Sequence, residues 1–400
     1  MNARALVLLG TLGWAIAACH STRPKATSTS PAAGTGGGSG VVTGGFPGIS
    51  ASTSSEASGT GSGSAGTGGK EPLADIHFLG RFDRSTPESP TFTWPGTAIV
   101  TRFSGTGLDV NLHDEGQNFF AVSIDGAAPT LLATTSAKDT YSLAQGLPEG
   151  EHDAMLFRRT ESFMGTVHFH GFSVKGGAAL IPTPAPFRRH LEVIGDSMSC
   201  GYGNDGVGPN CSYTAQTENG WLTYGAIAAR ALKAEPRLIA YSGKGVYRGG
   251  GGQTGEQMPV LYERTLADIP SSTWDFSSWT ADVVVVNLGT NDFMMGDPGQ
   301  PFIDAYAALI KQIRGHYPQA YILCGVGSML SGNGLIQCAS HVKSVVSAAN
   351  AGGDARVSYV DLGVQDGIVD GYGCDYHPSV KTDQLMADKL TAAITAVAGW

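Results

Sequence analysis

The chain carries the stretch Leu191-Glu192-Val193-Ile194-Gly195-Asp196-Ser197-Met198, an apolar run that ends in a small, acidic and hydroxylated turn. Such a turn can hold a serine hydroxyl at the carboxyl edge of a strand. A serine is a nucleophile only where a base reaches it, and Asp375-Tyr376-His377-Pro378 near the C-terminus contains an imidazole and a carboxylate. The pattern therefore predicts a reactive serine, Ser197, served by His377 and Asp375.

The second half of the chain alternates short apolar runs with helix-like segments. The runs are residues 191–194, 237–241, 283–288, 321–326 and 357–362, and the helical segments are residues 221–233, 253–267, 302–317, 336–349 and 381–397. This order predicts a five-stranded parallel sheet with helices on both faces, an α/β three-layer domain. Ligands of such sheets bind at the carboxyl ends of the strands.

Chemically useful residues follow the other runs. Ser242-Gly243-Lys244-Gly245 follows the second run and Gly289-Thr290-Asn291-Asp292 the third. Gly243 permits a backbone N–H to point at a ligand, and Asn291 offers a side-chain amide to the same point. A nucleophile, a base, an orienting acid and oxyanion donors are the parts that acyl transfer needs.

These four segments resemble the sequence blocks of the SGNH (GDSL-type) hydrolases, in order and at strand ends, over about residues 190–400. The resemblance implies that Ser197 is the nucleophile and His377 the base. It also implies an oxyanion hole that consists of the N–H of Ser197, the N–H of Gly243 and the side-chain amide of Asn291. No cofactor is implied.

One departure from the superfamily concerns the acid of the relay. Its usual position, three residues before the histidine, is Cys374 here, and the nearest carboxylate is Asp375, two residues before His377. We hypothesise that Asp375 fixes the tautomer.

The N-terminal half follows a different period. Residues from about 73 to 175 alternate apolar and polar side chains, with turn signals between short segments and no helix-length amphipathic stretch. This pattern predicts a jelly-roll-like β-sandwich over residues 71–178. A proline-rich connector, residues 179–189, then leads to the catalytic domain, residues 190–400.

A narrower resemblance covers both halves and is to carbohydrate esterase family 2. It rests on the sandwich and connector together with the motifs Gly80-Arg81-Phe82, Arg158-Arg159-Thr160-Glu161, Gly195 to Gly203, Thr217-Glu218-Asn219 and Ser242 to Val246. The resemblance implies a carboxylic ester hydrolase of the acetyl esterase type. Such enzymes remove O-acetyl groups from plant cell-wall polysaccharides such as xylan and glucomannan, here through an acyl-enzyme. The resemblance also implies that either Asp375 or a backbone carbonyl orients the imidazole of His377.

Four aromatic residues near these motifs are candidates for stacking on a sugar ring: Tyr202, Trp221, Tyr247 and Tyr376. Each is equally consistent with a core position.

Other functions share some of these features. A lipase or thioesterase of the same superfamily, or a peptidoglycan O-acetyl esterase, would keep the serine chemistry, and a non-catalytic carbohydrate-binding lipoprotein would keep only the fold. The stretch from Gly201 to Gly206 matches the dinucleotide fingerprint, but Pro209-Asn210-Cys211 stands where its helix should continue. We therefore expect neither a nucleotide cofactor nor a metal.

Composition indicates a globular protein without a nucleic-acid partner. The 400 residues are 42% hydrophobic and 15% charged, with a net charge of −9 and a pI near 5.5. We find no lysine and arginine cluster that would bind phosphates.

The N-terminus is typical of an exported bacterial lipoprotein. Arg4 precedes a short apolar run, and Ile16-Ala17-Ala18-Cys19 resembles a lipobox, so that residues 1–19 are a signal peptide and Cys19 the lipidated residue. A plain signal peptide and a secreted product are the alternative. Residues 20–70, rich in Gly, Ser and Thr, form a disordered linker. We expect a lipid anchor in the cell envelope, at the outer membrane or the cell surface.

Five cysteines follow Cys19, an odd number, so at least one is unpaired. Cys324 lies in an apolar run and is interpreted as a buried thiol. Disulfides are open to two pairings, Cys200 with Cys211 in the loop after the serine and Cys338 with Cys374 at the histidine loop. The chain has no paired C-x-x-C spacing, so the cysteine pattern does not indicate a zinc site.

Overall fold

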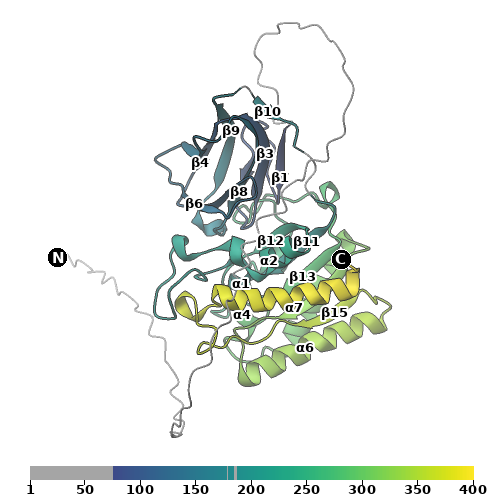
Figure 1. The fold of residues 1–400 in the computed structure, drawn as a ribbon. Helices are drawn as coiled ribbons and strands as arrows, with labels where there is room; N and C mark the ends of the chain where they lie inside the picture. Colours follow the sequence, from purple (N-terminus) through teal and green to yellow (C-terminus); the bar gives the residue numbers. More distant parts are fainter. Residues whose placement is uncertain (1–74, 178, 184–186) are drawn as a thin grey trace, which may run out of the picture. The chain divides into compact units, whose positions relative to one another are not determined.

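The computed structural model describes residues 75–177, 179–183 and 187–400 (Figure 1). The predicted signal peptide, Cys19 and the linker lie outside the described residues. No helix within the described ranges has the length and apolar character needed to cross a bilayer.

Two antiparallel sheets form the N-terminal domain. The first has the order β1 (Ile76–Leu79), β3 (Ala98–Gly105), β8 (Gly150–Arg158), β5 (Phe119–Ile124) and β6 (Thr130–Ala133), and β10 (Ala179–Ile181) also pairs with β3. The second has the order β2 (Thr91–Phe92), β9 (Val167–Lys175), β4 (Gly107–Asp114) and β7 (Thr140–Ala144). Strand β10 lies in the segment assigned to the connector, so the sandwich continues to Ile181.

Alternating side chains hold the two sheets together. Ile99, Phe120 and Leu156 from the first sheet share one core with Val110 and Phe169 from the second. In β3 and β4 buried and half-buried residues alternate, as the period of two requires. The predicted β-sandwich is therefore confirmed, whereas its jelly-roll connectivity stays a prediction.

The C-terminal domain contains a five-stranded parallel sheet. Its order is β12 (Glu235–Ala240), β11 (His190–Gly195), β13 (Val283–Asn287), β14 (Tyr321–Val326) and β15 (Val357–Asp361). All neighbours are parallel, and all five predicted runs are strands. The chain goes from β11 to β12 on one side and then returns to β13 on the other, so the direction of winding reverses at β11. Ligands of open parallel sheets bind at such a reversal, here beyond the carboxyl ends of β11 and β13.

Helices cover both faces of this sheet. Core residues of α5 (Gln300–His316) and α6 (Gly332–Ala351) pack with Val284 and Val286 of β13, while those of α2 (Tyr224–Ala231) and α7 (Val380–Ala398) pack with Val283 and Val285. The predicted three-layer arrangement is confirmed. The remaining helices are short: α1 (Ser197–Cys200), α3 (Met258–Leu261), α4 (Thr290–Phe293), η1 (Ser162–Met164), η2 (Ala215–Thr217), η3 (Gly220–Leu222), η4 (Phe276–Ser278) and η5 (Cys374–Tyr376).

The helix predicted over residues 253–267 is wrong in length, because only the single turn of α3 forms there. Arg81 of the sandwich donates from Nη1 to the carbonyl oxygens of Tyr262 and Arg264. A continued helix would need the Tyr262 carbonyl for its own hydrogen bond. A contact with the sandwich therefore lies where the longer helix was predicted.

Candidate active site

Ser197 is the first residue of α1, directly after the turn that ends β11. Asp196 caps this short helix, since its Oδ1 accepts from Met198 N at 3.1 Å. Gly195 is needed here, because a Cβ would stand 1.9 Å from Ser199 Oγ. The turn leaves Ser197 only 7% exposed at the edge where the parallel strands end.

His377 lies near the C-terminal end of the domain, far from Ser197 in sequence, and contacts the serine in the fold. It follows η5, on the loop between β15 and α7, and its Nε2 lies 2.9 Å from Ser197 Oγ. Its Nδ1 lies 3.2 Å from the backbone oxygen of Asp375. Because a carbonyl only accepts, Nδ1 carries the proton and Nε2 is the free base that faces the serine hydroxyl.

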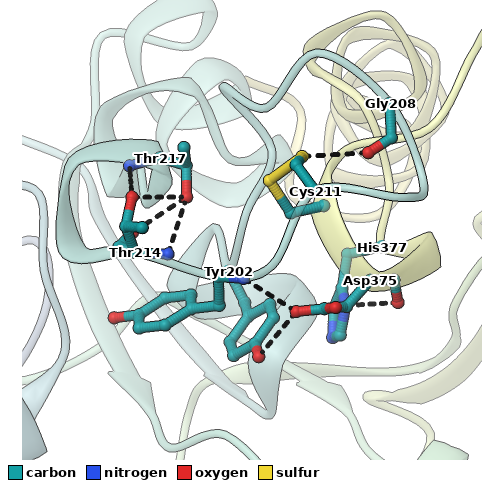
Figure 2. The surroundings of a disulfide bond; sticks show 9 residues. Tyr202, Gly208, Cys211, Thr214, Thr217, Asp375 and His377 are labelled. Atoms are coloured by element: carbon teal, nitrogen blue, oxygen red, sulfur yellow. Dashed lines mark hydrogen bonds between the residues drawn. A yellow bond between two sulfur atoms is a disulfide. The ribbon is translucent and has the colours of Figure 1, made fainter.

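The Asp375 side chain does not serve the imidazole, which corrects the predicted relay. Its Oδ2 accepts from Tyr202 OH at 3.1 Å and from the backbone N–H of Tyr213 at 2.9 Å (Figure 2). Asp375 is in the left-handed region, with φ of 51°. In this conformation its carbonyl meets His377 while its carboxylate holds the neighbouring loop. Of the two alternatives that the sequence left open, the backbone carbonyl orients the histidine.

Burial sets the protonation of the site. It lowers the pKa of His377 to about 4, and the hydrogen bond to the Asp375 carbonyl opposes this effect only in part. The imidazole is therefore a neutral base at neutral pH. Burial also raises the pKa of Asp196 to about 7, and the nearby carboxylate of Asp292 adds to this increase.

Both predicted disulfide pairings are wrong, because Cys211 is bonded to Cys374 (Figure 2). The bond joins the loop after the serine to the loop of the histidine, and Asp375 N also donates to the Cys211 carbonyl at 3.0 Å. Cys200 and Cys338 are free and buried in α1 and α6. Cys324 is a free buried thiol, as predicted.

The predicted oxyanion donors come together at the same edge. Asn291, in α4, donates from Nδ2 to the Lys244 carbonyl at 3.0 Å and to Asp196 Oδ2 at 3.3 Å. Its amide thus links the turns that follow β11, β12 and β13. Gly243 has φ of 78°, and nothing lies within 4 Å of the place where a Cβ would stand, so the space beside its backbone is open.

Asp292 is a supporting residue whose role the sequence analysis did not recognise. Its carboxylate accepts three backbone N–H groups, from Val246, Tyr247 and Arg248, at 2.8–3.0 Å. These bonds shape the loop that begins at Gly243. The only sequence signal was its position beside Asn291 after a buried strand.

The four candidate stacking aromatics differ in position. Tyr202 lies beside the site, with its ring centroid 4.2 Å from that of His377 and 4.2 Å from that of Tyr213. Tyr376 is 57% exposed and packs edge-on against Tyr372, and Tyr247 is half-buried.

The prediction that Trp221 stacks on a sugar is wrong. It is 5% exposed and lies in the core against Phe157 of the sandwich, at a centroid distance of 5.1 Å. Arg230 covers its ring at 4.1 Å. A sugar cannot reach it.

Two family models match the two domains. The model described as Carbohydrate esterase 2 N-terminal matches residues 78–184, and that of the GDSL-like Lipase/Acylhydrolase family matches residues 193–385. Together they cover the sandwich and the parallel-sheet domain.

Curated relatives and solved structures agree with these matches. The cellulase/esterase CelE of Acetivibrio thermocellus is 42% identical over 328 residues, which are 81% of this chain but only 40% of CelE. An acetylxylan esterase / glucomannan deacetylase of Cellvibrio japonicus is 27% identical over 329 residues, 81% of this chain and 89% of that protein. The structure of a family two carbohydrate esterase from Clostridium thermocellum in complex with cellohexaose has 42% identity and a TM-score of 0.79, over 81% of this chain and 99% of that chain. With both domains matched and the serine, histidine, glycine and asparagine gathered at one sheet edge, the chain belongs to carbohydrate esterase family 2.

Proposed function

We propose that the protein is a serine esterase that removes O-acetyl groups from plant cell-wall polysaccharides such as xylan or glucomannan. The observation that carries the proposal is the contact of 2.9 Å between Ser197 Oγ and His377 Nε2 at the carboxyl edge of the sheet. The activity named for the Cellvibrio japonicus relative, acetylxylan esterase / glucomannan deacetylase, supports the substrate class.

The reaction begins when Ser197 Oγ attacks the acetyl carbonyl and His377 Nε2 takes the hydroxyl proton. The Asp375 carbonyl oxygen, 3.2 Å from His377 Nδ1, accepts the Nδ1–H and so stabilises the imidazolium that forms. His377 then gives the proton to the sugar oxygen, which leaves, and the acetyl group stays on Ser197. A water molecule, deprotonated by His377, attacks this acyl-enzyme; the bond between the acetyl carbon and Ser197 Oγ breaks, His377 returns the proton to Ser197, and acetate leaves. The chemistry is that of a dyad with a backbone acceptor.

The negative oxygen of each tetrahedral intermediate needs donors. In the proposal these are the N–H groups of Ser197 and Gly243 and the amide of Asn291. The Asn291 amide gives up its longer contact, 3.3 Å to Asp196 Oδ2, when the oxyanion forms.

The sugar ring would lie on the aromatic group beside the histidine. Tyr202 and Tyr213 stack on each other with an interplanar angle of 22°, and Tyr202 also contacts the His377 ring. Flat aromatic faces bind the apolar face of a pyranose, so Tyr376, which is exposed beside this pair, is the proposed stacking residue, while the ring of Tyr202 is covered by Tyr213 and His377.

The direct test is acetate release from acetylated xylan, glucomannan and peptidoglycan, with the lost acetyl position identified by NMR. We expect release from the plant polysaccharides and none with Ser197→Ala. Faster hydrolysis of a long-chain ester, or acetate release from peptidoglycan alone, would contradict the proposed substrate.

The cell-envelope location is a second part of the proposal. Cys19 at the end of Ile16-Ala17-Ala18 supports a lipid anchor, with the linker as a tether. Wild-type protein should enter a detergent phase and a Cys19→Ala variant should remain in the aqueous phase. Equal partitioning of the two would contradict the anchor and favour a secreted enzyme.

Asp375→Asn should keep kcat within about threefold of wild type, since the backbone carbonyl that orients His377 is retained. Asparagine also tolerates the left-handed conformation of this residue, with φ of 51°. The measurement is kcat with an acetyl ester. A fall of about 10⁴-fold, as for loss of the carboxylate in a full triad, would show that the side chain acts on the imidazole after all.

On the acidic side of the pH profile, kcat/KM should fall at a pH well below that of a typical histidine enzyme. His377 must be neutral to act as base, so activity is present above its pKa and is lost as the pH falls through it. Because burial lowers this pKa to about 4, kcat/KM should stay level down to about pH 5. A pH profile, with circular dichroism as a check of folding, measures this. A midpoint at or above about 6.5 would contradict it.

Loss of the disulfide should destabilise the protein and loosen the histidine loop. Cys211 and Cys374 are 163 residues apart, and removal of such a cross-link typically costs about 2–5 kcal/mol of the free energy of unfolding. We expect a lower Tm and kcat for the Cys211→Ser/Cys374→Ser variant, measured by calorimetry and acetyl ester hydrolysis. Cys324→Ser is the control for a changed cysteine away from the site. Unchanged Tm and kcat would contradict the role of the bond.

A further inference from the structure

Two buried carboxyl groups lie next to the loop that begins at Ser242 and Gly243, here called the oxyanion loop. Neither group has a part in the mechanism above. Glu161 comes from the sandwich, immediately before η1, and Glu218 from the loop after η2. Both are fully buried, at 0% exposure. Each belongs to one of the family-like motifs, so the two motifs meet in space although they are 57 residues apart.

Glu161 binds both donors of the residue before Gly243. Its Oε2 accepts from Ser242 N at 2.7 Å, and its Oε1 accepts from Ser242 Oγ at 2.5 Å. Gly243 itself accepts one backbone hydrogen bond, from Gly250 N to its carbonyl oxygen at 3.1 Å, and nothing lies within 4 Å of its Cβ position. The direction of the Gly243 N–H therefore depends on hydrogen bonds to its neighbours, and Glu161 supplies two of them.

Glu218 in turn holds Glu161. Its Oε2 accepts from Glu161 N at 3.1 Å and from Tyr213 OH at 2.8 Å. Tyr213 stacks on Tyr202, whose ring lies against His377. The carboxyl pair thus lies between the sandwich, the oxyanion loop and the aromatic group beside the base.

No cation contacts either carboxyl group in the described part of the chain. The neighbouring arginines donate to backbone oxygens instead: Arg158 Nη2 to the Glu161 carbonyl at 2.9 Å and Arg159 Nε to the Glu218 carbonyl at 3.2 Å. Two carboxylates so close cannot both be charged when buried, so they share a proton. Burial raises the pKa of both groups, and the Glu161 charge adds to the increase at Glu218, whose pKa lies well above its usual range.

We propose that Glu161 is a positioning residue for the oxyanion hole, which it serves by fixing Ser242, the residue bonded to the Gly243 N–H, and that Glu218 holds Glu161 in place. The proposal rests on the esterase function proposed above. It gives the sandwich a direct part in catalysis, because one of its side chains sets the geometry of a donor in the other domain.

A metal is the competing interpretation of this cluster. Glu161, Glu218 and the Cys200 thiol place their ligand atoms within 4.8 Å of one another. However, both oxygens of Glu161 already accept hydrogen bonds from Ser242, and burial raises the pKa of Cys200 well above its usual value, which disfavours the thiolate that a metal needs.

The test compares Glu161→Gln, Glu161→Ala and Ser242→Ala on para-nitrophenyl acetate. Full loss of an oxyanion donor lowers kcat by about 10²- to 10³-fold, so a misplaced donor should cost about 10- to 100-fold in kcat with KM changed less than about twofold. Ser242→Ala, which keeps the backbone bond, should cost about threefold. Because the two residues act as one unit, Glu161→Gln/Ser242→Ala should be no slower than Glu161→Gln alone.

Glu192→Gln is the matched control. Glu192 is also fully buried between the domains, where it pairs with Arg81 at 3.3 Å and accepts from Tyr262 OH at 2.8 Å. It should lose stability like the Glu161 variants but keep kcat. Should Glu161→Ala fail to fold, the glutamine variant and the double variant still give the answer.

Three results would overturn the inference: wild-type kcat in Glu161→Gln, an equal loss of kcat in Glu192→Gln, or one tightly bound metal ion per chain in elemental analysis. A wild-type protein without activity on the ester would instead contradict the proposed function itself.

Discussion

Ser197→Ala should lower kcat by about 10⁴- to 10⁶-fold while the protein stays folded. The hydroxyl oxygen lies 2.9 Å from His377 Nε2 and is the nucleophile that becomes acylated, so its loss removes the covalent route. What remains is the slower attack of water in a site with intact oxyanion donors. The measurement is the initial rate of acetyl ester hydrolysis, with mass spectrometry to detect an acetylated protein in wild type only.

Ser199→Ala is the control for this variant, because it removes a hydroxyl two residues away. Ser199 is buried and bonds to Tyr224 OH at 2.6 Å, away from the imidazole. It should keep most of kcat. The pair Ser197→Ala/His377→Ala should be no slower than Ser197→Ala, since the two side chains act together. A Ser197→Ala enzyme with wild-type activity would end the assignment.

Asn291→Ala should lower kcat by about 10²- to 10³-fold, or about 3 kcal/mol of transition-state stabilisation. Its amide is held by the Lys244 carbonyl at 3.0 Å, so it reaches the oxyanion without a change of rotamer. Because the oxyanion exists only in the intermediates, KM should change little. Steady-state kinetics with para-nitrophenyl acetate separates the two parameters.

The neighbouring Asn287 offers a matched control for the asparagine. It is buried at the end of β13 and donates to Tyr224 OH at 3.1 Å. Asn287→Ala should lower Tm and leave kcat close to wild type. If Asn291→Ala kept kcat within about threefold, the donors would be the two backbone N–H groups alone.

The two halves of the chain differ in the pattern of their apolar residues, and this difference predicted the two domains. Alternation with period two buries one face of each sandwich strand, and Val283 to Asn287 is apolar at every position but the last because helices cover both faces of the sheet. Parallel strands end at one edge, so residues that follow different strands, such as Ser197 and Asn291, could be predicted to meet. The sheet confirms that expectation.

The incorrect predictions all involve contacts between distant segments. Arg81 of the sandwich donates to the carbonyl oxygens of Tyr262 and Arg264, where the long helix was predicted. Trp221 is in the core because Phe157 of the other domain packs on it. Spacing along the chain carries no information about such partners.

The sequence by itself determined the two domains, the parallel sheet and the edge at which Ser197, Gly243, Asn291 and His377 gather, because local periodicity and strand direction suffice for these. Only the tertiary structure decided how the residues act. The left-handed backbone at Asp375 offers a carbonyl in place of a carboxylate, and the meeting of two loops bonds Cys211 to Cys374. Both depend on where folded loops cross, and hydrogen-bond geometry in three dimensions fixes that crossing.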